Sequence, residues 1–305
     1  MQVVQQKRIK TKESVSGNLK VQHIKRTQLD EKKWNACIQT SSFPTLYALS
    51  WYLDNVSPNW EALIMGDYDY VFPLTVKRKL KTIKYIGAPP FCQQLGVFGN
   101  DPITQEIIDL FLGAIPSFYV RQDIALNHSN PFHEGCVRRD NFVVYATQDF
   151  KEGYSSQTKR NLKTASKYPL SIDSNIDFLS VIDLFVANKG SEIDKIDYSR
   201  LKDVCGVALN KSVLHSIGVK LDGVLVSGAL FVEFQQRWYM IMLASSKKGK
   251  ESLASTLIID EVIQKLIPKQ FALDFEGSSI PSLVRFYSGF GAKNEPYQMF
   301  TKRIL

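Results

Sequence analysis

The stretch Phe271-Ala-Leu-Asp-Phe-Glu-Gly-Ser-Ser-Ile-Pro-Ser-Leu-Val-Arg-Phe-Tyr-Ser-Gly-Phe-Gly-Ala292 predicts a strand, a tight turn and a helix in succession. Its first six residues alternate between two strand faces, with the large apolar residues Phe271, Leu273 and Phe275 on one of them. The opposite face carries two carboxylates, Asp274 and Glu276. The pattern therefore places both carboxylates at the carboxyl end of one strand.

The second part of the stretch predicts the turn and the helix. Gly277 and Ser278 interrupt the strand, Ser279 is a suitable helix cap, and Pro281 fits the first helical turn, where an N–H is not needed. Apolar residues then follow at helical spacing: Ile280, Leu283, Val284 and Tyr287. Two glycines, Gly289 and Gly291, end the helix. We therefore expect the phenol of Tyr287 beside the two carboxylates.

The helix sequence Phe286-Tyr287-Ser288-Gly289-Phe290-Gly291 resembles the end of the GNAT acyltransferase fold. The sequence Asp-Phe-Glu-Gly-Ser, followed by Arg-Phe-Tyr-x-x-Phe-Gly, is more similar still to the Fem-type branch of that fold. Fem-type proteins contain two GNAT-like halves in one chain and form amide bonds, typically on peptidoglycan precursors. The resemblance implies an α/β fold of two tandem GNAT-like domains, each a mixed, mostly antiparallel central sheet flanked by helices. A strand, turn and helix with aromatic residues is also common for purely structural reasons.

The chain of 305 residues is long enough for one large domain or two ordinary ones. Both halves predict a hairpin, a strand, a helix and a further strand. Leu221-Asp222-Gly223 is the expected turn of the second hairpin, and a strand over 141–146 is expected to close the first half. Tyr70 and Phe118 are 48 residues apart, and Val224 and Phe271 are 47 apart, which favours an internal duplication. We predict a partly disordered N-terminus over 1–18, a first domain over 19–150 and a second domain over 151–305, with the chemistry in the second.

The net charge of +8 and the pI near 9.1 favour an anionic partner, such as a phosphorylated cofactor, a nucleotide-linked substrate, RNA or a membrane surface. A basic surface without a partner is the plain alternative. Four scattered cysteines, no apolar leader and no run long enough to span a bilayer predict a cytoplasmic protein. We expect no metal, because His128, His133 and Cys136 lie in an irregular segment without an obvious fourth ligand.

The GNAT resemblance implies a site for the pyrophosphate of an acyl-CoA, held by backbone N–H groups where a loop enters a helix. The polar stretch over 245–252, which we expect to be a loop, occupies that place before a helix over 253–267. The candidate cofactor-binding residues are Ser246, Lys247, Lys248, Gly249 and Lys250. GNAT loops read Gln/Arg-x-x-Gly-x-Gly/Ala, whereas here Ser246 replaces the first residue and Glu251 the last small one. This departure favours an aminoacyl-tRNA donor, which the Fem-type resemblance implies, over acyl-CoA.

The resemblance also implies roles for individual residues. Tyr287 would protonate the leaving group, while Asp274 or Glu276 would take or orient the proton of an amine acceptor. A helix over 154–168 resembles the basic Fem-type helix, which implies that Arg160, Lys163 and Lys167 recognise an anionic small-molecule or peptidyl acceptor. The alternatives are a core aromatic for Tyr287, a structural hydrogen-bond partner for Asp274, and a solvated basic helix face.

These features together predict an N-acyltransferase that moves an acyl or aminoacyl group to an amine. One rival is a catalytically silent protein of the same fold that binds an anionic ligand or partner. A second rival, a nucleic-acid-binding protein, is disfavoured because the basic residues are dispersed and no zinc knuckle or helix-turn-helix pattern is present.

Overall fold

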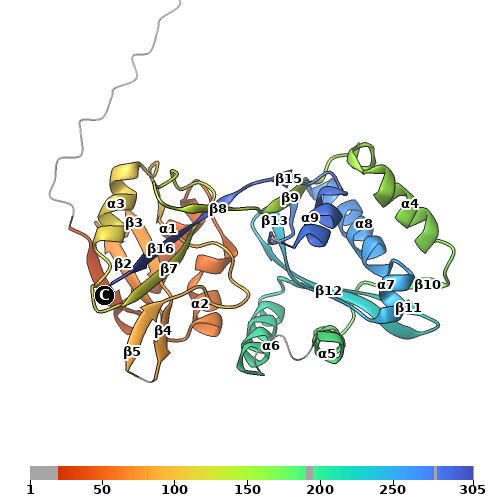
Figure 1. Ribbon diagram of the computed structural model, residues 1–305, viewed down its shortest axis with the longest axis horizontal. Coiled ribbons are helices and arrows are strands. Elements are labelled where there is room, and N and C mark those ends of the chain that lie inside the picture. The colour runs from red at the N-terminus through yellow and green to blue at the C-terminus, as the bar shows by residue number, and fades with distance from the viewer. Residues whose placement is uncertain (1–19, 81, 190–194, 278–279, 305) are drawn as a thin grey trace, which may run out of the picture.

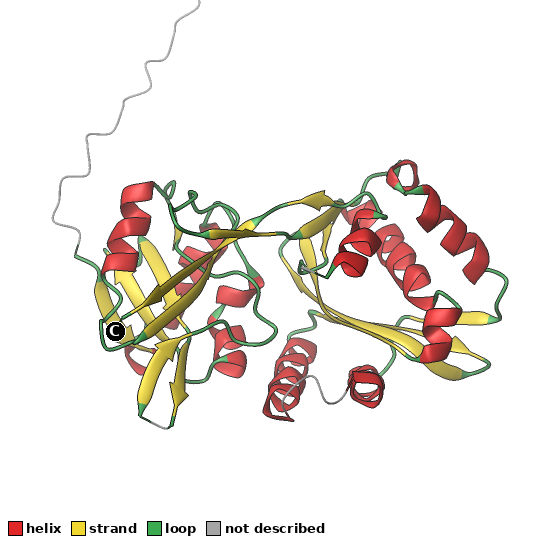
Figure 2. Ribbon diagram, viewed as in Figure 1, coloured by secondary structure: helices red, strands yellow, loops and turns green. Residues whose placement is uncertain are grey.

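The computed structural model describes residues 20–80, 82–189, 195–277 and 280–304. The expected disorder over 1–18 and the expected cap Ser279 lie outside these residues. Figure 1 shows two lobes side by side, with strands passing between them. Figure 2 shows that helices flank the sheets in both lobes.

The first lobe contains two sheets, with the strand orders β1-β2-β3-β6 and β4-β5-β7-β16-β8. Thr75 lies between β3 and β4 and exchanges hydrogen bonds with the backbone of Gly87, so the chain passes directly from one sheet to the other. The elements are β1 (Gln22–Lys25), η1 (Arg26–Gln28), α1 (Glu31–Thr40), η2 (Leu46–Ala48), α2 (Ser50–Val56), β2 (Glu61–Met65), β3 (Tyr70–Leu74), β4 (Val76–Lys79), β5 (Ile83–Ile86), β6 (Phe98–Gly99), α3 (Gln105–Gly113), β7 (Arg121–Leu126) and β8 (Val137–Arg139).

The second lobe is built on one seven-stranded sheet of order β10-β11-β12-β13-β14-β9-β15. Its long central hairpin turns at Asp222-Gly223, as predicted. The elements are β9 (Phe142–Tyr145), η3 (Phe150–Gly153), α4 (Ser156–Ala165), β10 (Leu170–Asp173), α5 (Phe178–Lys189), α6 (Lys195–Asn210), β11 (Leu214–Leu221), β12 (Val224–Phe234), β13 (Arg237–Ser245), α7 (Lys247–Glu251), α8 (Ala254–Leu266), η4 (Ile267–Lys269), β14 (Ala272–Asp274), α9 (Pro281–Ser288) and β15 (Lys293–Asn294). The last strand, β16 (Tyr297–Arg303), returns to the first lobe. The predicted fold class, α/β with mostly antiparallel sheets flanked by helices, is confirmed.

Two helical layers cover the seven-stranded sheet. Helices α8 and α9 bury one face, in a core that includes Leu273 and Phe275 on the strand face predicted to be apolar. Helices α5 and α6 share the other core with residues of the first lobe, and α6 packs against α2. The carboxylate-bearing face of β14 is therefore the face turned toward the first lobe.

Strand pairing crosses the predicted division at residue 150 in both directions. β16 lies between β7 and β8 in the first lobe. β9, which we expected to close the first half, instead pairs with β14 and β15 in the second lobe. Because β9 is buried along its first three residues, it needs a covered sheet interior, and the second lobe provides it.

β13 and β14 pair in parallel over only three positions, from Arg237 opposite Ala272 to Tyr239 opposite Asp274. β13 then continues to Ser245, while the chain after Asp274 leaves the sheet and enters α9. The two strands therefore separate beyond Tyr239. This fork sets the position of the candidate site.

Candidate active site at the junction of the two lobes

Glu276 lies just beyond the end of β14, at the junction of the lobes. Its backbone adopts a φ of +53°, which turns the chain out of the strand. The hydroxyl of Tyr47, from the first lobe, donates a hydrogen bond of 2.6 Å to its carboxylate. Burial raises the pKa of Glu276 to about 8, and the charge of Asp274 adds to this shift, while the bond from Tyr47 opposes it. A carboxyl group with this pKa is a base of suitable strength once it is ionised, which requires a pH near 8 or above.

Asp274 is held on all sides by structural partners. Only 1% of its surface is exposed. Arg237 donates to its carboxylate at 2.8 Å and Asn141 at 3.3 Å, and its other oxygen accepts the backbone N–H of Glu276 at 2.9 Å. These contacts fit the structural alternative for Asp274 and leave Glu276 as the better-placed proton acceptor.

Arg237 joins this network to the returning chain. Its guanidinium also donates to Glu295 at 3.2 Å, and the hydroxyl of Tyr145 donates to the same carboxylate. It lies 5.3 Å above the ring centre of Phe43 in the first lobe. Arg237 therefore connects β13, β14 and the segment between β15 and β16.

Tyr287 lies on α9 as predicted and is buried. Its ring stacks on Phe275, with centroids 4.6 Å apart and planes 12° from parallel. Burial raises the pKa of Tyr287 to about 12, and the charge of Glu276 contributes. Among the described residues its hydroxyl has no hydrogen-bond partner. The hydroxyl is therefore protonated at neutral pH.

A cavity of about 300 Å³ adjoins the part of β13 that β14 leaves unpaired. Its apolar lining includes Leu283 and Phe286, which share a face of α9 with Tyr287 at i, i+3 and i+4. Its polar end includes Ser245 and Ser255, whose hydroxyls are 2.6 Å apart. The lining residues are Phe185, Asn188, Leu243, Ala244, Ser245, Lys250, Ser255, Leu283 and Phe286.

The predicted cofactor loop is a short helix, so this prediction of local structure was wrong. Ser246 caps α7, and its hydroxyl accepts the N–H of Gly249 at 3.1 Å. A Cβ on Gly249 would lie 2.1 Å from the carbonyl oxygen of Val226, so the glycine is explained by packing against β12. Lys247 and Lys248 are exposed, whereas Lys250 lines the cavity. The N–H of Gly249 is thus already bonded within the protein.

The predicted acceptor residues lie on or just after α4. Arg160 and Lys163 are exposed, and Lys167 follows the end of the helix. The Arg160 guanidinium donates to Gln157 in its own helix at 3.0 Å. None of the three lines any of four main cavities in the described part of the chain. Their role in acceptor binding stays a prediction, and the structure does not bring them together with Glu276.

Of the residues considered as metal ligands, His128 and His133 each contact a backbone carbonyl. His128 Nδ1 is 2.9 Å from the carbonyl oxygen of Pro296, and His133 Nδ1 is 2.7 Å from that of Glu134. Within the described ranges, no three His, Cys, Asp or Glu side chains gather where they could hold a metal ion.

Sequence reasoning missed three residues of this site. Tyr47 lies in an aromatic-rich stretch over 42–60, whose composition favours core packing over the lining of a pocket, and its ring is indeed buried. Asn141 and Arg237 gave no local signal, because their partners lie far along the chain. Only the pairing of β13, β14 and β9 shows that these side chains meet.

No protein-family model matches the sequence, and no curated protein matches it. Its structure is similar to that of FemX, with a TM-score of 0.62 and 11% identity over 88% of this chain and 96% of FemX. It is also similar to the C-terminal domain of a putative lysylphosphatidylglycerol synthetase from Agrobacterium fabrum (TM-score 0.55, 11% identity, 89% and 91% covered). A tandem GNAT protein from the clavulanic acid biosynthesis pathway matches with a TM-score of 0.54 and 9% identity, over 94% and 99%.

The chain has the tandem GNAT fold. The resemblance drawn from the sequence is confirmed at the level of the fold. In the part of the chain that the structure describes, no helix combines the length and the apolar character needed to cross a bilayer.

Proposed function

We propose that this protein is an N-acyltransferase, which moves an acyl or aminoacyl group from an activated donor to an amine. The observation that carries the proposal is Glu276, a carboxyl group with a pKa of about 8 at the junction of the lobes. It lies at the fork between β13 and β14, close enough to Tyr287 for its charge to raise the pKa of that phenol. The proposal assigns the proton acceptor and the proton donor of the reaction to these two groups.

The proposed reaction uses both groups. The amine nitrogen attacks the carbonyl carbon of the donor, a C–N bond forms, and Glu276 takes the proton that the nitrogen loses. The bond from the carbonyl carbon to the leaving sulfur or oxygen breaks, and the Tyr287 hydroxyl gives its proton to that atom. Transfer of the Glu276 proton to solvent and reprotonation of Tyr287 restore the enzyme.

The acidity of Tyr287 favours an oxygen ester as the donor. A thiolate is the conjugate base of a thiol with a pKa near 8.5, so a phenol with a pKa of about 12 is a poor acid toward it. An alkoxide is a much stronger base and takes the proton readily. We therefore propose an aminoacyl-tRNA, an aminoacyl ester, as the preferred donor, with acyl-CoA as the alternative.

The geometry of α7 also favours an aminoacyl-tRNA donor over acyl-CoA. The N–H of Gly249, which would meet a pyrophosphate in an open loop, is bonded to Ser246, and β12 packs closely against the glycine. The cavity of about 300 Å³ is at the lower end of the range for ligand sites, roughly 300–1,000 Å³. It has room for an acyl or aminoacyl group rather than for a whole cofactor. The basic residues Lys247, Lys248 and Lys250 would meet the phosphates of tRNA.

The experiment is a transfer assay with radiolabelled aminoacyl-tRNA and, separately, acetyl-CoA, against a panel of primary amines, with products identified by mass spectrometry. Glu276→Gln should lower turnover by about 10² or more, because it removes the proton acceptor. Glu261→Gln is the control, since this α8 carboxylate pairs with Lys265 outside the site. Product formation that Glu276→Gln leaves unchanged would refute the mechanism. A folded protein that transfers from neither donor would support the silent-binding alternative.

A further inference from the structure

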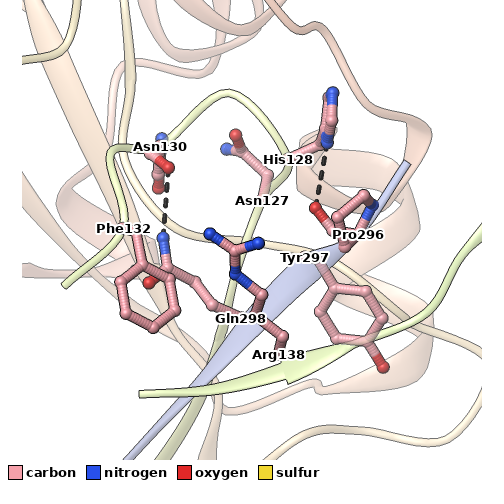
Figure 3. A pocket seen from close by; sticks show the side chains of 8 residues that line it. All are labelled: Asn127, His128, Asn130, Phe132, Arg138, Pro296, Tyr297 and Gln298. Carbon is pink, nitrogen blue, oxygen red and sulfur yellow. Dashed lines mark hydrogen bonds between the residues drawn. The ribbon is translucent and has the colours of Figure 1, made fainter. Parts of the chain in front are cut away.

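A second cavity, of about 230 Å³, lies in the first lobe beside β8 and β16 (Figure 3). It is formed by the loop after β7, by Arg138 of β8, and by the segment that leads into β16. Its lining residues are Asn127, His128, Asn130, Phe132, Arg138, Pro296, Tyr297 and Gln298. No acidic residue is among them, and Arg138 carries a permanent positive charge.

Arg138 is the group in this cavity that is left for a ligand. In Figure 3 its guanidinium rises into the middle of the pocket, between the rings of Phe132 and Tyr297. It lies 4.9 Å above the ring centre of Phe132. Among the described residues no carboxylate pairs with it. An unpaired arginine fork between two aromatic rings is suited to a carboxylate or phosphate, which it binds through two parallel hydrogen bonds.

The other polar groups of the cavity are largely engaged within the protein. The amide of Asn130 bonds both the N–H and the carbonyl of Val97. The amide nitrogen of Gln298 donates to the carbonyls of Asn130 and Pro131. These bonds engage the amide groups of the wall, and they leave Arg138 to meet a ligand.

A continuous chain of hydrogen bonds connects this cavity to the turn that carries Glu276. The N–H of Gly277 and the amide of Gln93 both donate to Asn141, at 2.9 and 3.1 Å. Gln94 donates to Gln93 at 2.8 Å and accepts the N–H of His128 at 3.0 Å.

Tyr297 gives a second link between the cavity and the site. Burial raises the pKa of Tyr297, and the charge of Glu276 adds to the shift, although Arg139 opposes it. Tyr297 and the hydrogen-bonded chain through Asn141 and Gln94 therefore connect the cavity to the turn that carries Glu276.

We propose that this cavity holds an anionic group, a carboxylate or a phosphate, at one end of the acceptor amine, with Arg138 as its anchor. The anion site stands on its own geometry, whereas its use for the acceptor rests on the proposed function. At about 230 Å³ the cavity is smaller than sites that enclose whole ligands, so it holds one end of the acceptor and leaves the amine to reach Glu276. The α4 residues Arg160, Lys163 and Lys167 are the competing anchor.

The binding test uses inorganic phosphate and acetate as separate probes of the full chain. The imidazole signal of His128, one of four histidines, is followed by NMR and assigned with a His128→Asn variant. We expect a saturable shift with at least one probe, and the stronger probe distinguishes a phosphate ligand from a carboxylate. Arg138→Ala should weaken that binding roughly tenfold or more, and Arg138→Lys less. Arg78→Ala, which removes an exposed arginine elsewhere in the same lobe, should leave it unchanged.

Two results would overturn the site. One is the absence of saturable binding of either anion to the wild-type protein at high millimolar concentration. The other is an anion affinity that Arg138→Ala leaves unchanged. If Arg160→Ala lowers the affinity instead, the anion binds at α4.

Kinetics then tests the role of the site separately. For an anionic acceptor, Arg138→Ala should raise KM roughly tenfold and leave kcat nearly unchanged, whereas a neutral acceptor should show no change in KM. If the anion binds through Arg138 but no amine is acylated, the proposed function fails and the anion site remains. If transfer occurs with no effect of Arg138→Ala, the acceptor role of the site is wrong.

Discussion

The hydroxyl of Tyr47 donates a 2.6 Å hydrogen bond to the carboxylate of Glu276, across the junction of the lobes and across 229 residues of sequence. This bond favours the charged form of Glu276 and so lowers its pKa. Tyr47→Phe should therefore move the acidic limb of the pH profile of kcat/KM to higher pH, by about one unit. Tyr154→Phe, which removes a comparable buried bond to Asp260, is the matched control and should not move the limb. If the acidic limb of the Tyr47→Phe profile lies at the same pH as in the wild type, the ionisation of Glu276 does not determine that limb.

The raised pKa of Glu276 also predicts a pH-dependent stability. The folded protein keeps a proton on this group up to a pH of about 8, whereas the unfolded chain releases it near the ordinary pKa of a glutamate, 4.5. Between these values the folded state binds more protons, so the free energy of unfolding falls as the pH rises, by at most about 1.4 kcal/mol per unit. Glu276→Gln abolishes this loss and should gain stability relative to the wild type from about pH 5 to about pH 8. Urea unfolding of both proteins at pH 5 and pH 8 measures this difference in the free energy of unfolding. A difference that is the same at the two pH values would contradict the prediction.

Gly249→Ala should destabilise the protein, because the added Cβ meets the carbonyl of Val226 at 2.1 Å and the strand cannot give way cheaply. Overpacking of this kind costs about 1–3 kcal/mol. Gly206→Ala is the control, since that helical glycine has open space around it and alanine favours helix. Thermal unfolding should show a lower Tm for the first variant and an equal or higher one for the second. A stable Gly249→Ala protein would argue that α7 opens readily.

Arg237→Ala should be among the more damaging substitutions at the junction. It leaves Asp274 buried without its cation and also releases Glu295, and breaking a buried pair on one side costs about 3–5 kcal/mol. Asp274→Asn should cost less, because Arg237 keeps Glu295. Denaturant unfolding of both single variants and of the double variant measures the coupling. Strict additivity would show that the two residues act independently.

Calorimetry with coenzyme A and acetyl-CoA tests the donor directly. If the closed α7 turn excludes a pyrophosphate, neither ligand should bind at micromolar concentration. Micromolar binding that is lost in a Lys247→Ala/Lys248→Ala variant would instead establish an acyl-CoA donor. Aminoacyl-tRNA binding, measured by filter retention, should weaken in the same variant and fall with added salt.

Local sequence pattern predicted the parts of the fold whose partners are near in sequence. The alternation from Phe271 to Phe275 assigned the two faces of β14 correctly, and Asp222-Gly223 located the central hairpin. Helix α7 was missed because five residues with three lysines show no apolar period. Its cap, Ser246, was taken instead for part of an open loop.

The site was predictable only in part for a related reason. The carboxylates and the phenol of Tyr287 lie within one stretch, and its pattern brought them together. The choice between Asp274 and Glu276 depended on Arg237, Asn141 and Tyr47, which come from three separate segments. No periodicity within one segment encodes such contacts, which follow from the strand order and from the packing of the two lobes.

The position of β16 has a consequence for how the protein is made. β16 fills the gap between β7 and β8, yet its residues follow the whole second lobe in the chain. During synthesis the facing edges of β7 and β8 therefore stay unpaired until Tyr297–Arg303 has left the ribosome. The early lobe is a natural client for a chaperone, and a nascent chain halted before β16 should aggregate where the finished protein does not.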